Sequence, residues 1–171
     1  MKRLTYAIVL AGAVLAAGSA TAITTVTTGG GGTLDCSGMA LSQGVIWPPD
    51  HKMVPLTIVS LPSDPTTTVM PVTVNIISIQ QDEPVNAPGS GNTAPDGIID
   101  NSTTPSTAYV RAERAGPGTG RIYFITFTAM DGSGNSCPAP VTLPVIVPHD
   151  QGQGYTPVDT GQLYDSTMVQ P

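Results

Sequence analysis

Beyond residue 34 the apolar residues come in short runs, in which apolar and polar positions often alternate. The clearest alternation lies in residues 121–130, where Tyr123, Ile125, Phe127 and Ala129 fall on one face and threonines fall on the other. A period of two residues is typical of strands that are buried on one face. No part of the chain after residue 22 shows sustained helical spacing of apolar residues, so the pattern predicts an all-β protein.

Turns rich in Pro, Gly, Asp and Ser separate the expected strands. Short strands at this spacing are typical of an immunoglobulin-like β-sandwich, and we expect about seven strands in two packed sheets. The strands are expected at residues 43–47, 53–60, 71–80, 98–101, 106–114, 121–130 and 139–147.

The first 22 residues follow a different pattern. Lys2 and Arg3 precede an uncharged, largely apolar run from Tyr6 to Ala17, and small residues end the segment at 20–22. These are the three parts of a cleaved secretory signal peptide. A membrane-spanning helix needs about 20 apolar residues, more than this run contains. We therefore expect an exported protein, secreted, displayed on the cell surface or periplasmic, with no membrane span after cleavage.

Four segments follow from these patterns. Residues 1–22 are the expected signal peptide, and residues 23–34 form a linker rich in Thr and Gly with four consecutive glycines. Residues 35–150 form the expected sandwich. Residues 151–171 are polar, with Gly and Pro but no apolar periodicity, which predicts a flexible C-terminal tail.

The charge balance narrows the class of partner. Lys2 and Arg3 are two of the six basic residues, and residues 1–22 contain no acid, so the rest of the chain has four basic and twelve acidic residues, a net charge of −8. So acidic a chain repels nucleic acid and anionic membranes and attracts cations. We expect a protein or cell-surface partner, whose identity the sequence leaves open.

The chain has two cysteines, Cys36 and Cys137. In an oxidising compartment a pair of cysteines in a small exported domain normally forms a disulfide. Each cysteine precedes a strand that is expected to start at the same end of the sandwich. This placement predicts a Cys36–Cys137 disulfide.

Two aromatic residues have two interpretations each. Tyr123, near the start of the sixth strand, is either a tyrosine-corner residue, whose hydroxyl bonds an upstream backbone group, or an ordinary core tyrosine. Trp47 is the only tryptophan. We expect it to fill the core at one end of the sandwich, with a platform for stacking sugars as the alternative.

If successive strands alternate in direction, both histidines and several acids converge on the end opposite the cysteines. Carboxylate oxygens favour calcium, and histidine nitrogens favour transition metals. The structural alternative is that the acids cap turns or pair with Arg111 or Arg114. The calcium candidates are Asp82, Glu83, Asp96 and Asp100, and the candidates for a second metal site are His51 and His149.

Motifs for catalysis are missing from the sequence. It has no nucleophile elbow, no phosphate-binding loop, no dinucleotide fingerprint and no CxxC pair. Isolated acids on a small sandwich are far more often solvated than catalytic. We therefore expect a protein that is not an enzyme.

Five short motifs remain, which are IWPPDHKMV at 46–54, DEPVN at 82–86, RAER at 111–114, DGSGN at 131–135 and VPHDQ at 147–151. These five segments resemble bacterial secreted Ig-like modules, which are related in fold to hyaline-repeat and fibronectin type III-like domains. The chain departs from the family pattern at Asp50, where Asn is expected, and at residues 89–92, where an acidic glycine-rich stretch is expected. The resemblance implies an Ig-like fold.

Three functions are open at this point. The first is a non-catalytic secreted or cell-surface module with a structural or adhesive role. The second is a subunit of an extracellular filament that assembles by strand donation, from residues 23–28 or from residues 163–169. The third is a binding module that calcium stabilises.

Overall fold

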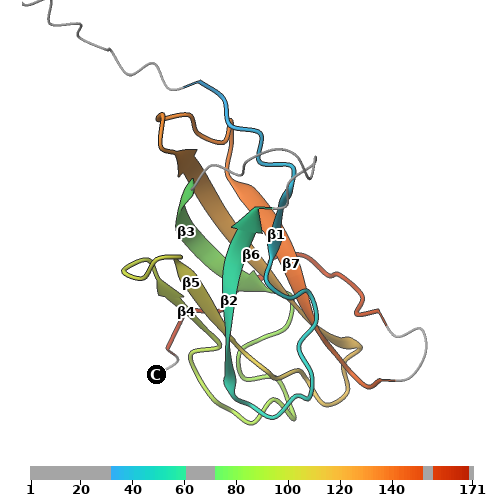
Figure 1. The fold of residues 1–171 in the computed structure, drawn as a ribbon. Coiled ribbons are helices and arrows are strands. Elements are labelled where there is room, and N and C mark those ends of the chain that lie inside the picture. The colour runs from blue at the N-terminus through green and yellow to red at the C-terminus, as the bar shows by residue number, and fades with distance from the viewer. Residues whose placement is uncertain (1–31, 61–71, 152–155, 170–171) are drawn as a thin grey trace, which may run out of the picture.

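A computed structural model describes residues 32–60, 72–151 and 156–169. The chain forms two antiparallel four-stranded sheets packed as a sandwich, with strand orders β1-β2-β5-β4 and β7-β6-β3-β8 (Figure 1). The first seven strands have the order of an immunoglobulin constant-type domain, which confirms the predicted fold class. The strands are β1 Met39–Leu41, β2 Met53–Ser60, β3 Val72–Gln81, β4 Gly97–Asp100, β5 Thr107–Arg111, β6 Gly120–Asp131, β7 Val141–Pro148 and β8 Tyr164–Asp165.

Strand β6 lies at the centre of its sheet, between β3 and β7. Its predicted apolar face is confirmed, because Tyr123, Ile125, Phe127 and Ala129 are all buried. The opposite sheet contributes Leu56, among others, to the same core. Alternating side chains of both sheets thus fill the space between them, as expected for a sandwich.

The first predicted strand, residues 43–47, is wrong. The chain pairs with β2 earlier, at Met39–Leu41, and then crosses to the other sheet. There Val45 forms a single parallel bridge with Ile146 of β7. Gly44 lies at the crossing, and one extended segment serves both sheets, so neither pairing is long enough to give a clear alternating pattern.

The C-terminal residues differ from the predicted flexible tail in the part that the structure describes. Tyr164–Asp165 forms β8 and pairs with Gln80–Gln81 of β3. Ser166 is buried, and its carbonyl accepts hydrogen bonds from the amides of Asp96 and Gly97 at 2.9 and 2.7 Å. Residues 156–169 therefore join the two sheets. Backbone hydrogen bonds hold this segment, so apolar periodicity gave no signal for it.

Side chains close the same edge of β3 further along. Asn101 bonds both backbone groups of Ile76, through its Oδ1 and Nδ2 atoms, at 2.9 Å each. The hydroxyl of Ser106 donates to the carbonyl of Val74 at 2.6 Å. Along this edge, the part of β3 from Val74 to Gln81 thus has hydrogen-bond partners. Among these partners in the described part of the chain, β8 is a strand and the others are side chains or loop backbone.

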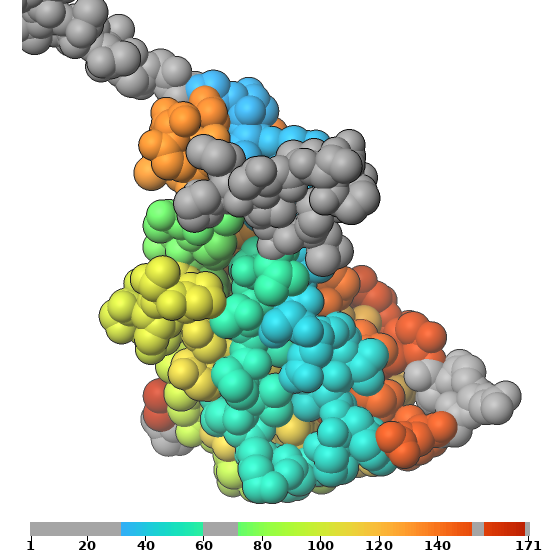
Figure 2. All heavy atoms as spheres, in the orientation of Figure 1, coloured from blue at the N-terminus to red at the C-terminus, as the bar shows by residue number. Residues whose placement is uncertain are grey.

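A disulfide and a turn hold the N-terminal residues of the described chain against one end of the sandwich. The Cys36–Cys137 disulfide is confirmed, with a Cα–Cα distance of 5.7 Å. Asn135 accepts a hydrogen bond from the amide of Gly32 at 2.7 Å, and Thr33 pairs with Ser136. The last residues of the predicted linker are therefore attached to the sandwich, where the blue and orange segments meet in Figure 2.

We expect Gly97→Ala to weaken the attachment of the C-terminal segment. A Cβ at Gly97 would lie 2.9 Å from Cβ of Ser166 and 3.2 Å from Cγ2 of Ile79. Such overpacking costs about 1–3 kcal/mol, measurable by urea unfolding. Gly132→Ala is the matched control, because a Cβ there meets nothing within 4 Å. Equal stability of the two variants would contradict the tight seating of Ser166.

Candidate functional site: a buried charge network

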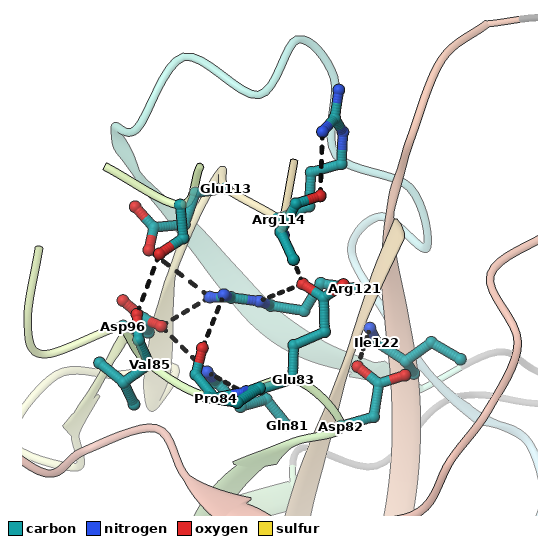
Figure 3. A network of polar contacts seen from close by, with 12 residues as sticks. Gln81, Asp82, Glu83, Pro84, Val85, Asp96, Glu113, Arg114, Arg121 and Ile122 are labelled. Atoms are coloured by element: carbon teal, nitrogen blue, oxygen red, sulfur yellow. Dashed lines mark hydrogen bonds and ion pairs between the residues drawn. The ribbon is translucent and has the colours of Figure 1, made fainter. Parts of the chain in front are cut away.

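The charged residues at the end opposite the disulfide surround one buried arginine. Arg121, at the start of β6, is fully buried. Its Nη1 donates to Oδ2 of Asp96 at 2.6 Å, and its Nε donates to Oε2 of Glu83 at 3.3 Å. Its Nη2 reaches the carbonyl of Pro84 at 3.3 Å. The guanidinium thus lies between two carboxylates from the two ends of the β3–β4 loop (Figure 3).

A second arginine and a third carboxylate complete the network. Glu113 follows β5 and is fully buried; its Oε1 lies 3.6 Å from Nη1 of Arg121. Arg111, the last residue of β5, has its Nε 3.6 Å from Oδ1 of Asp96 and 4.0 Å from Oε2 of Glu113. Arg111 also donates to the carbonyls of His51 and Pro95, at 3.0 and 2.7 Å.

The strand order explains why these residues meet. Glu83 lies just after β3, Asp96 just before β4, Arg111 and Glu113 at the end of β5, and Arg121 at the start of β6. In an antiparallel sandwich these strand ends all lie at one end of the molecule. The network therefore ties together loops from both sheets.

The charges of the network do not cancel. Arg111 and Arg121 carry two positive charges, while Glu83, Asp96 and Glu113 carry three negative charges when ionised. A buried charge without a partner is costly. Burial accordingly raises the pKa of Asp96 to about 6, against the opposing effects of the Gln81 hydrogen bond and of Arg121.

His51 covers the outer side of the network. Its Nδ1 lies 3.1 Å from Oε2 of Glu113, which also accepts a hydrogen bond from the hydroxyl of Thr93 at 2.7 Å. The side chain of His51 is 46% exposed, while that of Glu113 is fully buried. His51 lies in the turn that precedes β2 and has a φ of 64°, an uncommon backbone conformation.

Tyr123 links the network to the core. The buried hydroxyl donates to the carbonyl of Arg111 at 2.8 Å and accepts from Nη1 of Arg121 at 3.1 Å. Burial raises the pKa of this tyrosine. A hydrogen bond from a tyrosine at the start of the sixth strand back to the end of the fifth is that of a tyrosine corner. Of the two interpretations of Tyr123, the structure favours the corner.

The four acids predicted as calcium ligands do not meet. Glu83 and Asp96 bind Arg121, whereas Asp82 accepts a hydrogen bond from the amide of Ile122 at 2.8 Å. Asp100 lies at the far end of β4, where it binds Ser102. In the ranges that the structure describes, no group of three or more His, Cys, Asp or Glu side chains is arranged to hold a metal ion.

The two histidines predicted as a second metal site have different partners. His149 has its Nε2 3.2 Å from the carbonyl of Gly116, and its Nδ1 3.3 Å from Oδ2 of Asp150. Its own carbonyl accepts from Nε of Arg114 at 3.1 Å. His51, by contrast, contacts Glu113. The two histidines thus lie in different loops, and each attaches its loop to another part of the chain.

The expectation that Trp47 fills the core is wrong. Trp47 is 40% exposed, while its neighbour Ile46 is only 3% exposed. Successive side chains of an extended segment point to opposite sides, and Ile46 takes the inward position. The tryptophan ring therefore lies at the surface beside the prolines of the turn.

Sequence reasoning missed the centre of the network. It only counted Arg121 among the four basic residues, and it did not single out Gln81, whose amide donates to Asp96 at 3.0 Å. The available signal was position: Arg121 opens the longest strand, whose following residues are apolar.

Comparison with known proteins gave no relatives. No family model matches the chain, and no curated protein and no solved structure matches it. Within residues 32–60, 72–151 and 156–169, no helix is long and apolar enough to cross a membrane. The fold and site define the class of protein: a disulfide-bonded β-sandwich with a buried charge network at one end.

The raised pKa of Asp96 leads us to expect a stability that falls as the pH rises. The folded pKa, about 6, lies above the usual value of 3.8, so the folded state holds this proton more tightly than the unfolded state. The extra stability is complete below about pH 4 and is lost as the pH rises through 6; for a buried group it amounts to about 1–3 kcal/mol.

Urea unfolding between pH 4 and pH 7.5 measures this effect. Asp96→Asn should flatten the dependence, because the titrating group is gone. Asp100→Asn is the control and should leave the dependence intact, since Asp100 lies at the far end of β4, away from the network, and its carboxylate binds Ser102 of its own turn. A wild-type stability that rises steadily across this range would contradict the expectation.

Proposed function

We propose that this protein is an exported, non-catalytic module of the cell surface or the extracellular space, with a structural or adhesive role. One observation carries the proposal: the segments that resemble bacterial secreted Ig-like modules supply the internal contacts of the sandwich. His51 of segment 46–54 contacts Glu113 of segment 111–114 at 3.1 Å. Glu83 of segment 82–86 binds Arg121 at 3.3 Å. These motif residues hold the loops together through hydrogen bonds and ion pairs.

The other two segments make contacts of the same kind. In segment 131–135, Asp131 accepts hydrogen bonds from the amides of Ser133 and Asn135, at 2.9 Å each. In segment 147–151, the carbonyl of His149 accepts from Arg114. Because the polar side chains of these motifs hold loops together, the motifs support a structural role of the protein rather than a catalytic one.

The two ends of the module suit a protein outside the cell. A disulfide fixes one end, and a network of ion pairs around the fully buried Arg121 fixes the other. A chain whose loops cannot open locally resists proteolysis, because proteases need an unfolded segment. The predicted signal peptide supports the same location. These features support a proposed site of action in the extracellular space, at the cell surface or in the periplasm.

The proposal is tested by locating the protein and by removing it. We expect an epitope-tagged chain, expressed in its own host, to be found in the medium, on intact cells or in the periplasm. Cells without the gene should lose attachment or envelope integrity, and the wild-type gene should restore it. Retention in the cytoplasm, or turnover of a substrate by the purified folded protein, would contradict the proposal.

A further inference from the structure

A polar hollow of about 370 Å³ lies on the outer face of the sheet β7-β6-β3-β8, at the disulfide end. Its floor consists of Thr73 and Asn75 of β3 and of Thr128 and Met130 of β6. These are the strand positions that alternate with buried residues, so their side chains point away from the core. Ser136, the neighbour of one cysteine of the disulfide, lines the hollow from the following loop.

The elements around this hollow hold its side chains in fixed places. Asn75 lies directly opposite Thr128, and Thr73 lies directly opposite Met130, in the antiparallel pairing of β3 with β6. The backbone of Ser136 bonds the N-terminal residues of the described chain at 3.1 and 2.8 Å. A β-bulge interrupts the register of β3 just beyond Asn75, and bulges redirect side chains next to functional sites. A ligand would therefore find these groups already ordered, which lowers the cost of binding.

The polar side chains of the hollow have unused hydrogen-bonding capacity. None of the four makes a hydrogen bond to another residue of the described chain, and they are those of Thr73, Asn75, Thr128 and Ser136. Hydroxyl and amide groups both donate and accept hydrogen bonds. Met130 is 49% exposed and adds apolar surface between them, and a methionine side chain adapts to ligands of different shape.

A second polar hollow, of about 230 Å³, adjoins the first towards the β4–β5 loop. Thr73 and Asn75 line both hollows, so the two meet at these residues. The loop contributes Asn101, Thr103 and Thr104, among others. In Figure 2 the orange turn after β6, the green start of β3 and the yellow β4–β5 loop follow one another along one side of the molecule. The two hollows thus form one polar surface with the start of β3 at its centre.

No charged side chain of the described chain lines either hollow. Asp100 and Asp131 are adjacent in sequence to lining residues, but their carboxylates bond groups of their own turns. A phosphate would find no positive partner here, and an apolar ligand would remove water from the hydroxyl groups without replacing its hydrogen bonds. A peptide strand needs an open sheet edge, whereas the first hollow lies on a sheet face. The lining therefore fits an uncharged ligand that is rich in hydroxyl groups.

We propose that the two hollows bind a neutral oligosaccharide, with neighbouring sugar rings on either side of Thr73 and Asn75. Each sugar hydroxyl donates and accepts hydrogen bonds, as the threonine hydroxyls of the site do. The apolar face of one ring packs against Met130. The volume of the first hollow lies in the usual range for sites that bind small ligands. Because each hydrogen bond replaces one to water and contributes little, we expect a dissociation constant on the order of 1 mM.

The test uses the folded chain, purified with its disulfide intact, so it gives a result whatever the role and location of the protein. The chain is titrated with neutral hexasaccharides of glucose, mannose, galactose and N-acetylglucosamine, while the NMR signals of its backbone amides are recorded. At least one of them should shift the amides of Thr73, Asn75 and Thr128. A hexasaccharide of galacturonic acid should not bind, because the lining carries no positive charge and the chain is acidic.

Three variants locate the binding. Thr128→Val removes one hydroxyl and keeps the branched shape, so it should weaken binding about threefold to tenfold. Thr142→Val is the matched control, because Thr142 lies on the same sheet face but lines neither hollow; its affinity should be unchanged. Trp47→Ala should also bind normally.

Three results would overturn the proposal. The first is that no neutral hexasaccharide binds at about twenty times the expected dissociation constant. The second is that Thr128→Val binds as tightly as Thr142→Val. The third is that Trp47→Ala abolishes binding, which would assign the sugar to the exposed tryptophan instead.

Discussion

Replacement of Arg121 by methionine is expected to lower the free energy of unfolding by about 3–5 kcal/mol, because it removes one partner of a buried ionic network. The substitution keeps an apolar side chain of similar length but leaves Glu83, Asp96 and Glu113 with Arg111 as the one remaining arginine. All contacts of Arg121 with these acids are 3.6 Å or shorter. Urea unfolding followed by tryptophan and tyrosine fluorescence measures the loss.

Arg114→Met is the matched control for this substitution. Arg114 lies at the same end and is partly buried, but it donates to the carbonyls of Ala115 and His149. Its replacement should cost about 1 kcal/mol. The double variant Arg121→Met with Asp96→Asn should lose less than the sum of the single variants, since their interaction is counted once. A loss below 1 kcal/mol for Arg121→Met would show that the network does not stabilise the fold.

Removal of the disulfide is expected to have an effect of similar size at the other end. Replacing both Cys36 and Cys137 by serine should lower the free energy of unfolding by about 2–5 kcal/mol. The bridge joins residues 101 positions apart, so its formation closes a large loop and lowers the conformational entropy of the unfolded chain. A reductant added to the wild type should reproduce the loss, and the same reductant should leave the double variant unchanged. If both proteins are equally stable without reductant, the bridge contributes nothing.

The strands with strong alternation were predicted well from the sequence. The predicted bounds of 53–60 agree with β2, and residues 121–130 lie within β6. Long strands contain many alternating positions, so their buried face can be recognised without knowing which strands pair with them. The disulfide was predictable for a different reason, because two cysteines in an exported chain have one another as partners.

The short elements were not predictable in the same way. Strand β1 has three residues and β8 has two, and both exist because of backbone hydrogen bonds to β2 and β3. Backbone bonding leaves little trace in the side-chain pattern. The same limit applies to Trp47, whose exposure depends on which of two adjacent apolar residues turns inward.

The sequence indicated the end of the sandwich at which the charged residues gather, but it did not indicate that they form a network around Arg121. The convergence of His51, Glu83 and Asp96 at one end followed from strand alternation, and pairing of acids with arginine was one of the alternatives. The sequence placed equal weight on every acid, however, and it could not tell that Asp100 lies at the far end of β4, away from the network. Which carboxylates meet depends on register, and a register is set by the whole sheet.

The position of the disulfide determines how the module responds to a pulling force. A load that enters at Gly32 and leaves through the C-terminal segment crosses from Cys36 directly to Cys137, so the 100 residues between the cysteines lie outside the path of tension. Only residues 138–169 can be extended, which limits the released length to roughly 100 Å. Strands β1 to β6 therefore carry no tension, whereas β7 and β8 lie on the loaded path. Under load, the disulfide would therefore limit how far the protein can extend.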